Sequence, residues 1–206
     1  MGAWVRWILR PLLDNQEAWL LLNVLYFSVA LLGAIFSFLN PSPQKALLSG
    51  VREALSPGSS LGPLVDAYRG GHLVSAALLT FAVNLLAGSL LFITVPSLVV
   101  PFAGVLAGFY RAALWGIMFS PACAALAPVM APHLVTILVE GEAYVVAMLG
   151  ALLWWWPVFT ARGRRWEQWQ RGLKLQARLY VAIAFLLALG ATYEALEIVY
   201  LIPSLR

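Results

Sequence analysis

Residues 179–202 read LYVAIAFLLALGATYEALEIVYLI, an apolar run that contains two carboxylates, Glu194 and Glu197. Such a run is long enough for an α-helix to cross a hydrocarbon core of about 30 Å, which takes roughly 20 residues. An ionised side chain at that depth costs on the order of 2.5 to 3.5 kcal/mol, so it is normally kept where it meets a partner, a water-filled cavity or a task. The stretch therefore predicts a membrane-spanning helix and marks both carboxylates as candidate functional residues.

The composition extends this interpretation to the rest of the chain. Hydrophobic residues make up 62% and charged residues 11% of the 206 positions, whereas soluble domains have about 45 to 50% apolar and about 25% charged residues. Several spans leave little room for a separate soluble domain. The sequence predicts an all-α, polytopic integral membrane helix bundle, with one transmembrane helical domain over residues 15–206.

The apolar runs divide the chain into segments. Residues 1–14, with Arg6 and Arg10 among tryptophans and leucines, predict an amphipathic helix in the membrane interface. A polar loop, residues 40–72, is expected outside the cytoplasm and contains one amphipathic piece at 45–55. Full spans are predicted at 18–39, 73–95, 98–119 and 179–202, and two shorter apolar runs lie at 122–139 and 143–159.

A basic segment, residues 162–178, sets the expected orientation. Its six positive residues predict a cytoplasmic loop that includes a surface helix. If the N-terminus is also inside and every apolar run crosses, this basic loop falls outside, which contradicts the positive-inside rule. The conflict disappears if the segment 122–139, interrupted by Pro128 and Pro132, does not cross and is re-entrant. Five crossings plus this broken segment are therefore predicted, with six crossings as the alternative.

The polar residues of the apolar runs predict a buried cluster. Arg111 is the expected cationic partner of Glu194 or Glu197, because it is the available cation near membrane depth. His133 and Glu140 are expected to satisfy each other, with proton relay as the functional alternative. The full predicted cluster consists of Asn84, Arg111, His133, Glu140, Glu142, Glu194 and Glu197.

Two further sets of residues are predicted to have structural roles. Small residues let membrane helices approach closely, and the expected packing positions are Gly88, Gly104, Gly108 and Gly190. Tryptophan and arginine are enriched at the membrane surface, and the expected surface positions are Trp154, Trp155, Trp156, Arg162, Arg164, Arg165, Trp166 and Trp169.

Several classes of function find no support in the sequence. There is no H-E-x-x-H motif, no convincing Ser-His-Asp or Cys-His set and no glycine-rich phosphate loop. Cys123 is the single cysteine, which excludes an internal disulfide. We therefore expect no catalytic residues, no metal and no cofactor. The positive charges lie beside apolar segments, so lipid headgroups rather than nucleic acid are the expected partner.

The order of polar residues within the apolar runs resembles the stage II sporulation protein M family of prokaryotic membrane proteins. The resemblance covers most of the chain after residue 75. It is carried by Thr80-Phe81-Ala82-Val83-Asn84, by Phe102-Ala103-Gly104-Val105-Leu106-Ala107-Gly108, by Pro132-His133 with Glu142-Ala143-Tyr144-Val145-Val146-Ala147, and by Glu194-Ala195-Leu196-Glu197 before Pro203. Family members place a glycine after the histidine, whereas Leu134 follows here and Glu142 lies nine residues on.

The resemblance implies a non-enzymatic, multi-pass protein of a prokaryotic plasma membrane. The founding member anchors and organises secreted peptidoglycan-degrading partners, so a scaffold or assembly subunit for other membrane or envelope proteins is expected. The alternative is a transporter or permease subunit, with a polar path lined by the buried Glu and His residues and a cytoplasmic ATPase on the basic loop. A homo-oligomer stays open in both interpretations.

Overall fold

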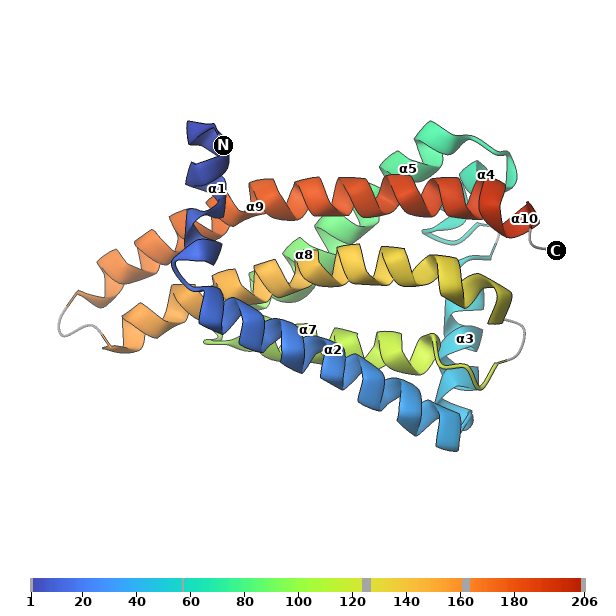
Figure 1. Cartoon of the computed structure of the whole chain (residues 1–206), viewed down its shortest axis with the longest axis horizontal. Coiled ribbons are helices and arrows are strands. Elements are labelled where there is room, and N and C mark those ends of the chain that lie inside the picture. Colours follow the sequence, from blue (N-terminus) through green and yellow to red (C-terminus); the bar gives the residue numbers. More distant parts are fainter. Residues whose placement is uncertain (1, 57, 124–126, 161–163, 205–206) are drawn as a thin grey trace.

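The computed structural model describes residues 2–56, 58–123, 127–160 and 164–204, and these residues form helices joined by turns. The long helices lie side by side in an elongated bundle, with the N-terminal helix and the C-terminus toward opposite ends (Figure 1). The helices of the bundle are α2 (Gln16–Leu39), α5 (Leu73–Ala82) with η1 (Val83–Thr94) and α6 (Val95–Val99), α7 (Ala103–Met118), α8 (Ala127–Thr160), and α9 (Arg165–Leu196) with η3 (Glu197–Leu201) and α10 (Ile202–Ser204).

Four helices in the described part of the chain are long and apolar enough to cross a membrane: Gln16–Leu39, Leu73–Val99, Val129–Thr160 and Arg165–Leu201. Helix α7 has 16 residues, which gives a length of about 24 Å at 1.5 Å per residue. It is apolar but shorter than these four helices. The fold is therefore all-helical and typical of an integral membrane protein, as the composition predicts.

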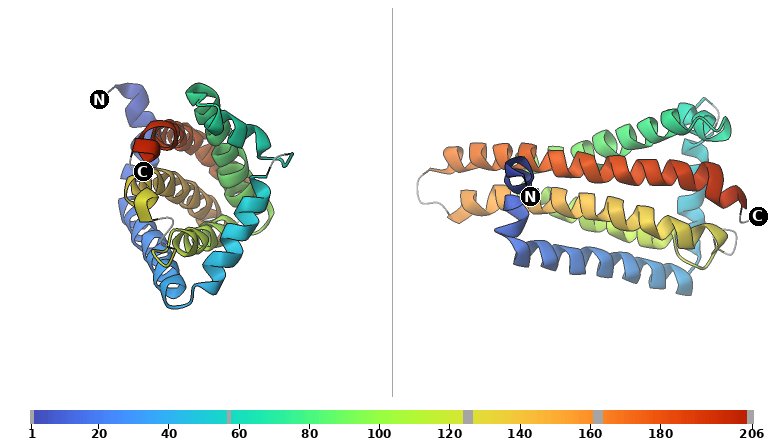
Figure 2. Two further views of the ribbon diagram at one scale, coloured as in Figure 1. Left: turned by 90° about the vertical axis from the view of Figure 1, so that its right-hand side faces the viewer. Right: turned by 45° about the horizontal axis from the view of Figure 1, so that its top comes forward.

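Helix α8 forms the centre of the bundle. It packs against α9, α2, α7 and η1, and the end-on view shows it surrounded by them (Figure 2). Between Ala143 and Leu149, every side chain is at most 1% exposed. The outward surfaces of α2 and α9 carry exposed leucines and phenylalanines instead, which is the pattern expected of helices that face lipid.

The continuity of α8 corrects one expectation from the sequence. The runs 122–139 and 143–159 were expected to be separate, with a break at Pro128 or Pro132, but residues 127–160 form one helix of 34 residues. Pro132 is only the sixth residue of this helix, so its missing N–H removes one backbone bond close to the helix end. Residues 124–126, which belong to the expected re-entrant segment, lie outside the described residues.

The hairpin between the second and third spans also differs from the expectation. Pro96 and Ser97 were expected to form the turn, but they lie in α6, within the helical stretch that runs from Leu73 to Val99. Pro96 lies near the C-terminal end of this stretch, which ends three residues later at Val99. The turn is made by residues 100–102, where Phe102 has a left-handed backbone with φ of 60°.

Three short helices lie at the two ends of the bundle. Helix α1 (Ala3–Leu13), which covers the segment predicted to lie in the membrane interface, packs against α9. At the opposite end, α3 (Ser42–Ala54) covers the predicted amphipathic piece, and α4 (Gly62–Arg69) is a helix that the sequence did not reveal. The Gln44 side chain of α3 donates to the carbonyl oxygens of Met118 and Ser120, so this end is a folded cap.

The basic segment 162–178 is not a separate surface helix. From Arg165 onward it forms the start of α9, and Arg162 lies outside the described residues. The hairpin of α8 and α9 projects beyond the ends of the other bundle helices on the side where α1 lies (Figure 1). Positive residues from α1 and α9 therefore gather at one end of the bundle, which we call the basic end; they are Arg6, Arg10, Arg164, Arg165, Arg171, Lys174 and Arg178.

Candidate functional site: a polar cavity at the capped end

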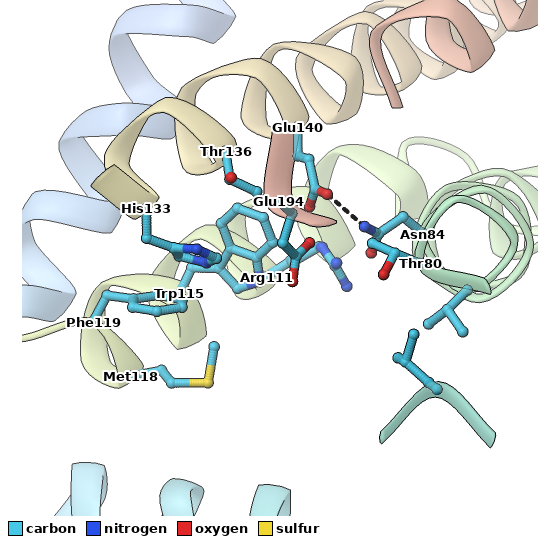
Figure 3. Close-up of a pocket in the computed structure, with 12 residues that line it drawn as sticks. Thr80, Asn84, Arg111, Trp115, Met118, Phe119, His133, Thr136, Glu140 and Glu194 are labelled. Atoms are coloured by element: carbon cyan, nitrogen blue, oxygen red, sulfur yellow. Dashed lines mark hydrogen bonds between the residues drawn. The ribbon is translucent and has the colours of Figure 1, made fainter. Parts of the chain in front are cut away.

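A polar cavity of about 230 Å³ lies inside the bundle, toward the end that carries the cap (Figure 3). Its wall contains both acidic and basic side chains together with a histidine and an amide. The lining residues come from α4, α5, η1, α7, α8 and α9: Leu64, Thr80, Val83, Asn84, Arg111, Trp115, Met118, Phe119, His133, Thr136, Glu140 and Glu194.

Helical spacing places most of these groups. His133, Thr136 and Glu140 recur at intervals of three and four residues along α8, so they share one face. Thr80 and Asn84 share a face of the α5–η1 helix for the same reason. The backbone widens to π-helical geometry from Val83 onward, and π-helical turns occur frequently at functional sites.

A chain of hydrogen bonds connects three helices across the inner wall. The guanidinium Nη2 of Arg111 donates to the Tyr144 hydroxyl at 2.8 Å, and that hydroxyl donates to Oδ1 of Asn84 at 3.3 Å. Nδ2 of Asn84 then donates to Oε1 of Glu140 at 2.6 Å. The Tyr144 hydroxyl accepts one bond and donates the next, so the four side chains hold α7, α8 and η1 together.

Arg111 has a different environment from the expected one. Among the described residues, no ion pair joins it to a carboxylate. Its guanidinium lies 4.2 Å from the Tyr144 ring centroid and 5.2 Å from that of Trp115, and rings at such distances attract a cation. Its Nε is buried and lacks a hydrogen-bond partner within the described part of the chain.

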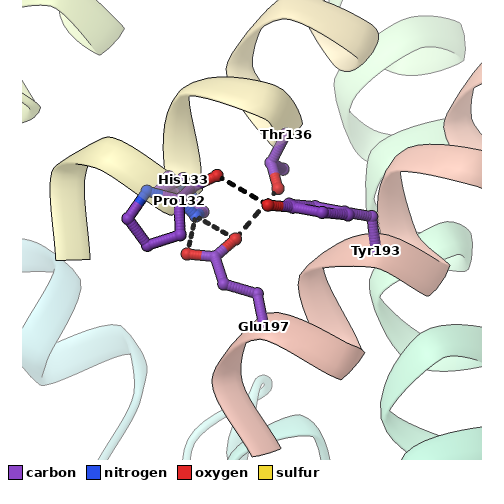
Figure 4. A network of polar contacts seen from close by, with 5 residues as sticks. All are labelled: Pro132, His133, Thr136, Tyr193 and Glu197. Atoms are coloured by element: carbon purple, nitrogen blue, oxygen red, sulfur yellow. Dashed lines mark hydrogen bonds and ion pairs between the residues drawn. The ribbon is translucent and has the colours of Figure 1, made fainter. Parts of the chain in front are cut away.

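Glu197 and His133 form a second network beside the cavity (Figure 4). Nδ1 of His133 lies 3.2 Å from both carboxylate oxygens of Glu197, and Thr136 donates to Oε2 at 3.2 Å. The Tyr193 hydroxyl donates to the carbonyl oxygen of Pro132 at 3.1 Å. His133 therefore meets Glu197 rather than Glu140, and the contact joins the first turns of α8 to η3.

Two of the expected carboxylates behave differently from Glu140 and Glu197. Glu194 lines the cavity and has no hydrogen bond or ion pair to any described residue. Glu142 lies outside the cavity and accepts the indole N–H of Trp19 at 2.6 Å. Residues two apart on an α-helix point about 200° apart, so Glu140 and Glu142 cannot face the same space.

The cavity does not continue as an open path toward the basic end. Tyr144 and Met148, the next side chains along that face of α8, are 0% exposed. Farther toward the basic end, a smaller polar cluster joins η1 to α9. Tyr180 contacts Ser89 at 3.2 Å and Thr94 at 2.7 Å through its hydroxyl, and Nε2 of Gln176 donates to Thr94 at 3.0 Å.

The expected packing glycines stand at close helix approaches. A Cβ on Gly88 would lie 2.9 Å from the Tyr144 hydroxyl oxygen, and one on Gly190 would lie 2.9 Å from Cγ of Glu140. A Cβ on Gly104 would lie 2.5 Å from the Ile93 carbonyl oxygen, and one on Gly108 would overlap the Met148 sulfur. Gly88 and Gly190 thus make room for the polar network itself.

The aromatic residues expected at the surface divide into two groups. Trp154 is 0% exposed and packs on Gly172 and Trp169, so it belongs to the core. Trp155 is half-buried, and its indole N–H donates to the Ser97 carbonyl oxygen at 2.6 Å. The exposed members of the set are Trp156, Arg164, Arg165 and Trp166.

Several residues of the site were not identified from the sequence. Tyr144 follows Glu140 by four residues and so continues the polar stripe of α8, which is a signal that could have found it. Tyr68 of α4 meets the Thr80 hydroxyl at 2.7 Å. Burial, followed by the nearby charge of Glu194, raises the pKa of the Tyr68 phenol, which therefore stays protonated.

The cavity combines apolar surface with charged side chains. No group of three or more His, Cys, Asp or Glu side chains in the described ranges is arranged to hold a metal ion. Trp115 and Phe119 supply apolar surface, Arg111 supplies a cation, and Glu194 supplies a carboxylate. Comparison of the chain with family models, with curated proteins and with solved structures finds no match.

Proposed function

We propose that the protein is a non-enzymatic scaffold or assembly subunit that spans a prokaryotic plasma membrane several times and holds partner proteins. The proposal follows the function that the resemblance to stage II sporulation protein M implies. One observation supports it most: the polar groups inside the bundle bond to each other across helices, and Tyr144 and Met148, farther along the same face of α8, are fully buried. Such an interior fastens helices and offers no continuous path.

In this proposal, five helices cross the membrane, and the basic end faces the cytoplasm. The positive residues of α1 and of the α8–α9 hairpin lie at the same end of the bundle (Figure 1), which removes the conflict that six full crossings would create. The N-terminal helix is then inside, and the capped end with its cavity faces outward.

The cap offers a surface for an extracytoplasmic partner. Helix α3 is held by the bonds of Gln44 to the carbonyl oxygens of Met118 and Ser120, so its exposed surface has a fixed position. That surface includes Lys45, Val51, Arg52 and Glu53. A rigid helix with mixed charges and an apolar residue is a suitable contact surface, because little conformational entropy is lost on binding.

The test is purification of the protein from its native membrane in mild detergent, with mass spectrometry of whatever accompanies it. The variant Arg52→Glu changes the exposed face of α3, and Arg171→Glu is the matched control on the exposed side of α9. The proposal predicts a stoichiometric partner that is lost with Arg52→Glu and retained with Arg171→Glu. A protein that purifies without any partner would contradict it.

Transport is a second candidate function, favoured by the polar cluster of Ser89, Thr94, Gln176 and Tyr180 between the cavity and the basic end. A conformational change that joins this cluster to the cavity would complete a polar path. In that case, the double change Glu194→Gln and Glu197→Gln abolishes an ion-dependent activity while assembly stays intact, because a neutral amide cannot exchange a proton. The scaffold proposal instead predicts unchanged partner binding and no such activity in liposomes.

A further inference from the structure

An apolar groove of about 640 Å³ lies at the basic end, between α1, α2, α8 and α9. Its walls include Ile8 and Leu12 of α1 and Val181 and Phe185 of α9. The volume lies within the range of small-molecule sites. The polar side chains in the lining are Gln16, Trp19 and Glu142.

A basic hollow of about 370 Å³ lies across α1 from this groove. It is lined by Arg6, Trp7, Arg10 and Arg178. The guanidinium of Arg178 lies 4.4 Å from the centroid of the Trp7 ring, which fixes its position. Arg10 is partly neutralised by Asp14 at 3.2 Å, so Arg6 and Arg178 carry the uncompensated charge.

Two nitrogen atoms of Arg178 are left without a hydrogen-bond acceptor. Both Nε and Nη2 are shielded from solvent and have no hydrogen-bond partner within the described part of the chain. A buried donor of a charged group without an acceptor is costly. An Arg guanidinium presents several donors in a fixed fork that matches phosphate oxygens, so a phosphate is the anion that this geometry favours.

The hollow and the groove follow each other along α9. Arg178, then Val181 and Ala182, then Phe185 lie on one helix face at intervals of three and four residues. The distance from Arg178 to Phe185 is about 10 Å along the helix axis at 1.5 Å per residue. A phosphate at Arg178 therefore stands where the apolar groove begins, with the rest of the groove deeper in the bundle.

We propose that this composite site binds one anionic phospholipid of the leaflet at the basic end, with its phosphate on Arg178 and Arg6 and an acyl chain in the groove beneath α1. The carboxylate of Glu142 lines the groove and not the basic hollow, and it accepts the Trp19 N–H at 2.6 Å. The bound lipid would hold α1 against α9. This proposal is independent of what the protein assembles or transports.

The experiment measures thermal unfolding of the delipidated protein in detergent micelles titrated with phosphatidylglycerol or with phosphatidylcholine of the same chains. Phosphatidylglycerol is expected to stabilise the protein at lower concentration than phosphatidylcholine. Arg178→Gln should weaken the phosphatidylglycerol effect about fivefold, since one cation near anionic lipid contributes about 1 kcal/mol. The matched control Lys174→Gln removes one exposed charge from the same helix and should change nothing.

Two further variants and a headgroup control keep the outcome decisive if Arg178→Gln fails to fold. Arg6→Gln removes a headgroup contact from α1 and should also weaken the phosphatidylglycerol effect, while Ala182→Phe should block the groove and weaken the effect of the lipid without changing the charge. Glycerol phosphate, which has the headgroup anion without chains, should not stabilise the protein. Equal stabilisation by both lipids, by glycerol phosphate, or in the Arg178→Gln and Lys174→Gln variants would overturn the proposal.

Discussion

Asn84 and Glu140, 56 residues apart in the chain, are joined by a hydrogen bond of 2.6 Å between Nδ2 and Oε1. This bond ties η1 to the central helix α8 at membrane depth. The bond is the last of three that begin at Arg111. Arg111 and Glu140 are therefore linked through Tyr144 and Asn84 without a direct contact.

The first prediction concerns this bond. Replacing Asn84 with Ala leaves Glu140, which is 2% exposed, without its donor. We expect the free energy of unfolding to fall by about 0.6 to 2 kcal/mol, the range for polar contacts between membrane helices. A double-mutant cycle with Glu140→Ala, followed by unfolding in detergent, should show coupling. Strictly additive effects would mean that the two side chains do not interact.

The second prediction assigns the partner of Arg111. Arg111→Met removes a charged donor from the Tyr144 hydroxyl, and we expect a loss of about 1.5 to 3 kcal/mol, as for hydrogen bonds to charged groups. The effect should be coupled to Tyr144→Phe and additive with Glu197→Gln, because Glu197 pairs with His133 instead. If Arg111→Met is coupled to Glu197→Gln and not to Tyr144→Phe, Arg111 pairs with Glu197, as the sequence suggested.

The third prediction uses the only two histidines of the chain, His72 and His133. His133→Leu leaves the carboxylate of Glu197, which is 1% exposed, with Thr136 as its one remaining side-chain hydrogen-bond partner among the described residues. We expect a clear drop in melting temperature, since an unsatisfied buried group costs about 1 to 3 kcal/mol and more when it is charged. His72→Leu alters an exposed side chain and is the matched control. Equal melting temperatures for the two variants would contradict the pairing.

The fourth prediction tests the close approach of α2 and α7. A Cβ on Gly116 would overlap the carbonyl oxygen of Ala30, so Gly116→Ala should destabilise the protein by about 1 to 3 kcal/mol through overpacking. Gly50 is also helical but exposed, with nothing within 4 Å of its Cβ position. Gly50→Ala should therefore stabilise the protein slightly, by up to about 1 kcal/mol. If Gly116→Ala also stabilised the protein, α2 and α7 would be able to move apart to accommodate the added methyl group.

The fifth prediction concerns orientation. A cysteine at position 168, near the start of α9, should react with an impermeant thiol reagent in inverted vesicles and not in intact cells, because the basic end is cytoplasmic in our proposal. The native Cys123 is replaced by Ser first, since it is the single cysteine. Rapid labelling of position 168 from outside intact cells would overturn the orientation.

The sequence predicts the all-helical membrane fold and several residues that line the cavity. It predicts less well which of these residues contact each other. Asn84, Arg111, Glu140 and Glu194 line one cavity because helical spacing puts each on an inward face. Which of them touch depends on the rotation and depth of neighbouring helices, which a single sequence does not specify. Arg111 accordingly meets Tyr144 rather than a carboxylate.

Proline positions account for the errors in the helix boundaries. Pro132 and Pro96 each suggest an end or a break, but Pro132 lies in the second turn of α8 and Pro96 lies near the end of the Leu73–Val99 helix. Each therefore removes one backbone hydrogen bond close to a helix end. The separation of Glu140 from Glu142 was available from the sequence, because residues two apart on one helix face opposite sides. This argument requires Glu140 and Glu142 to lie on one helix, whereas the sequence predicts separate segments at 122–139 and 143–159.

In our proposal, the cavity near the capped end does not continue toward the basic end. The direct measurement is thiol accessibility in oriented vesicles, with Cys123→Ser as the background and single cysteines at Glu194 in the cavity and at Thr94 in the deeper cluster. The account predicts that position 194 reacts with a small impermeant reagent from the capped side alone, and that position 94, at 6% exposure, reacts from neither side. Reaction of both positions from both sides would show a continuous path through the bundle and contradict the account.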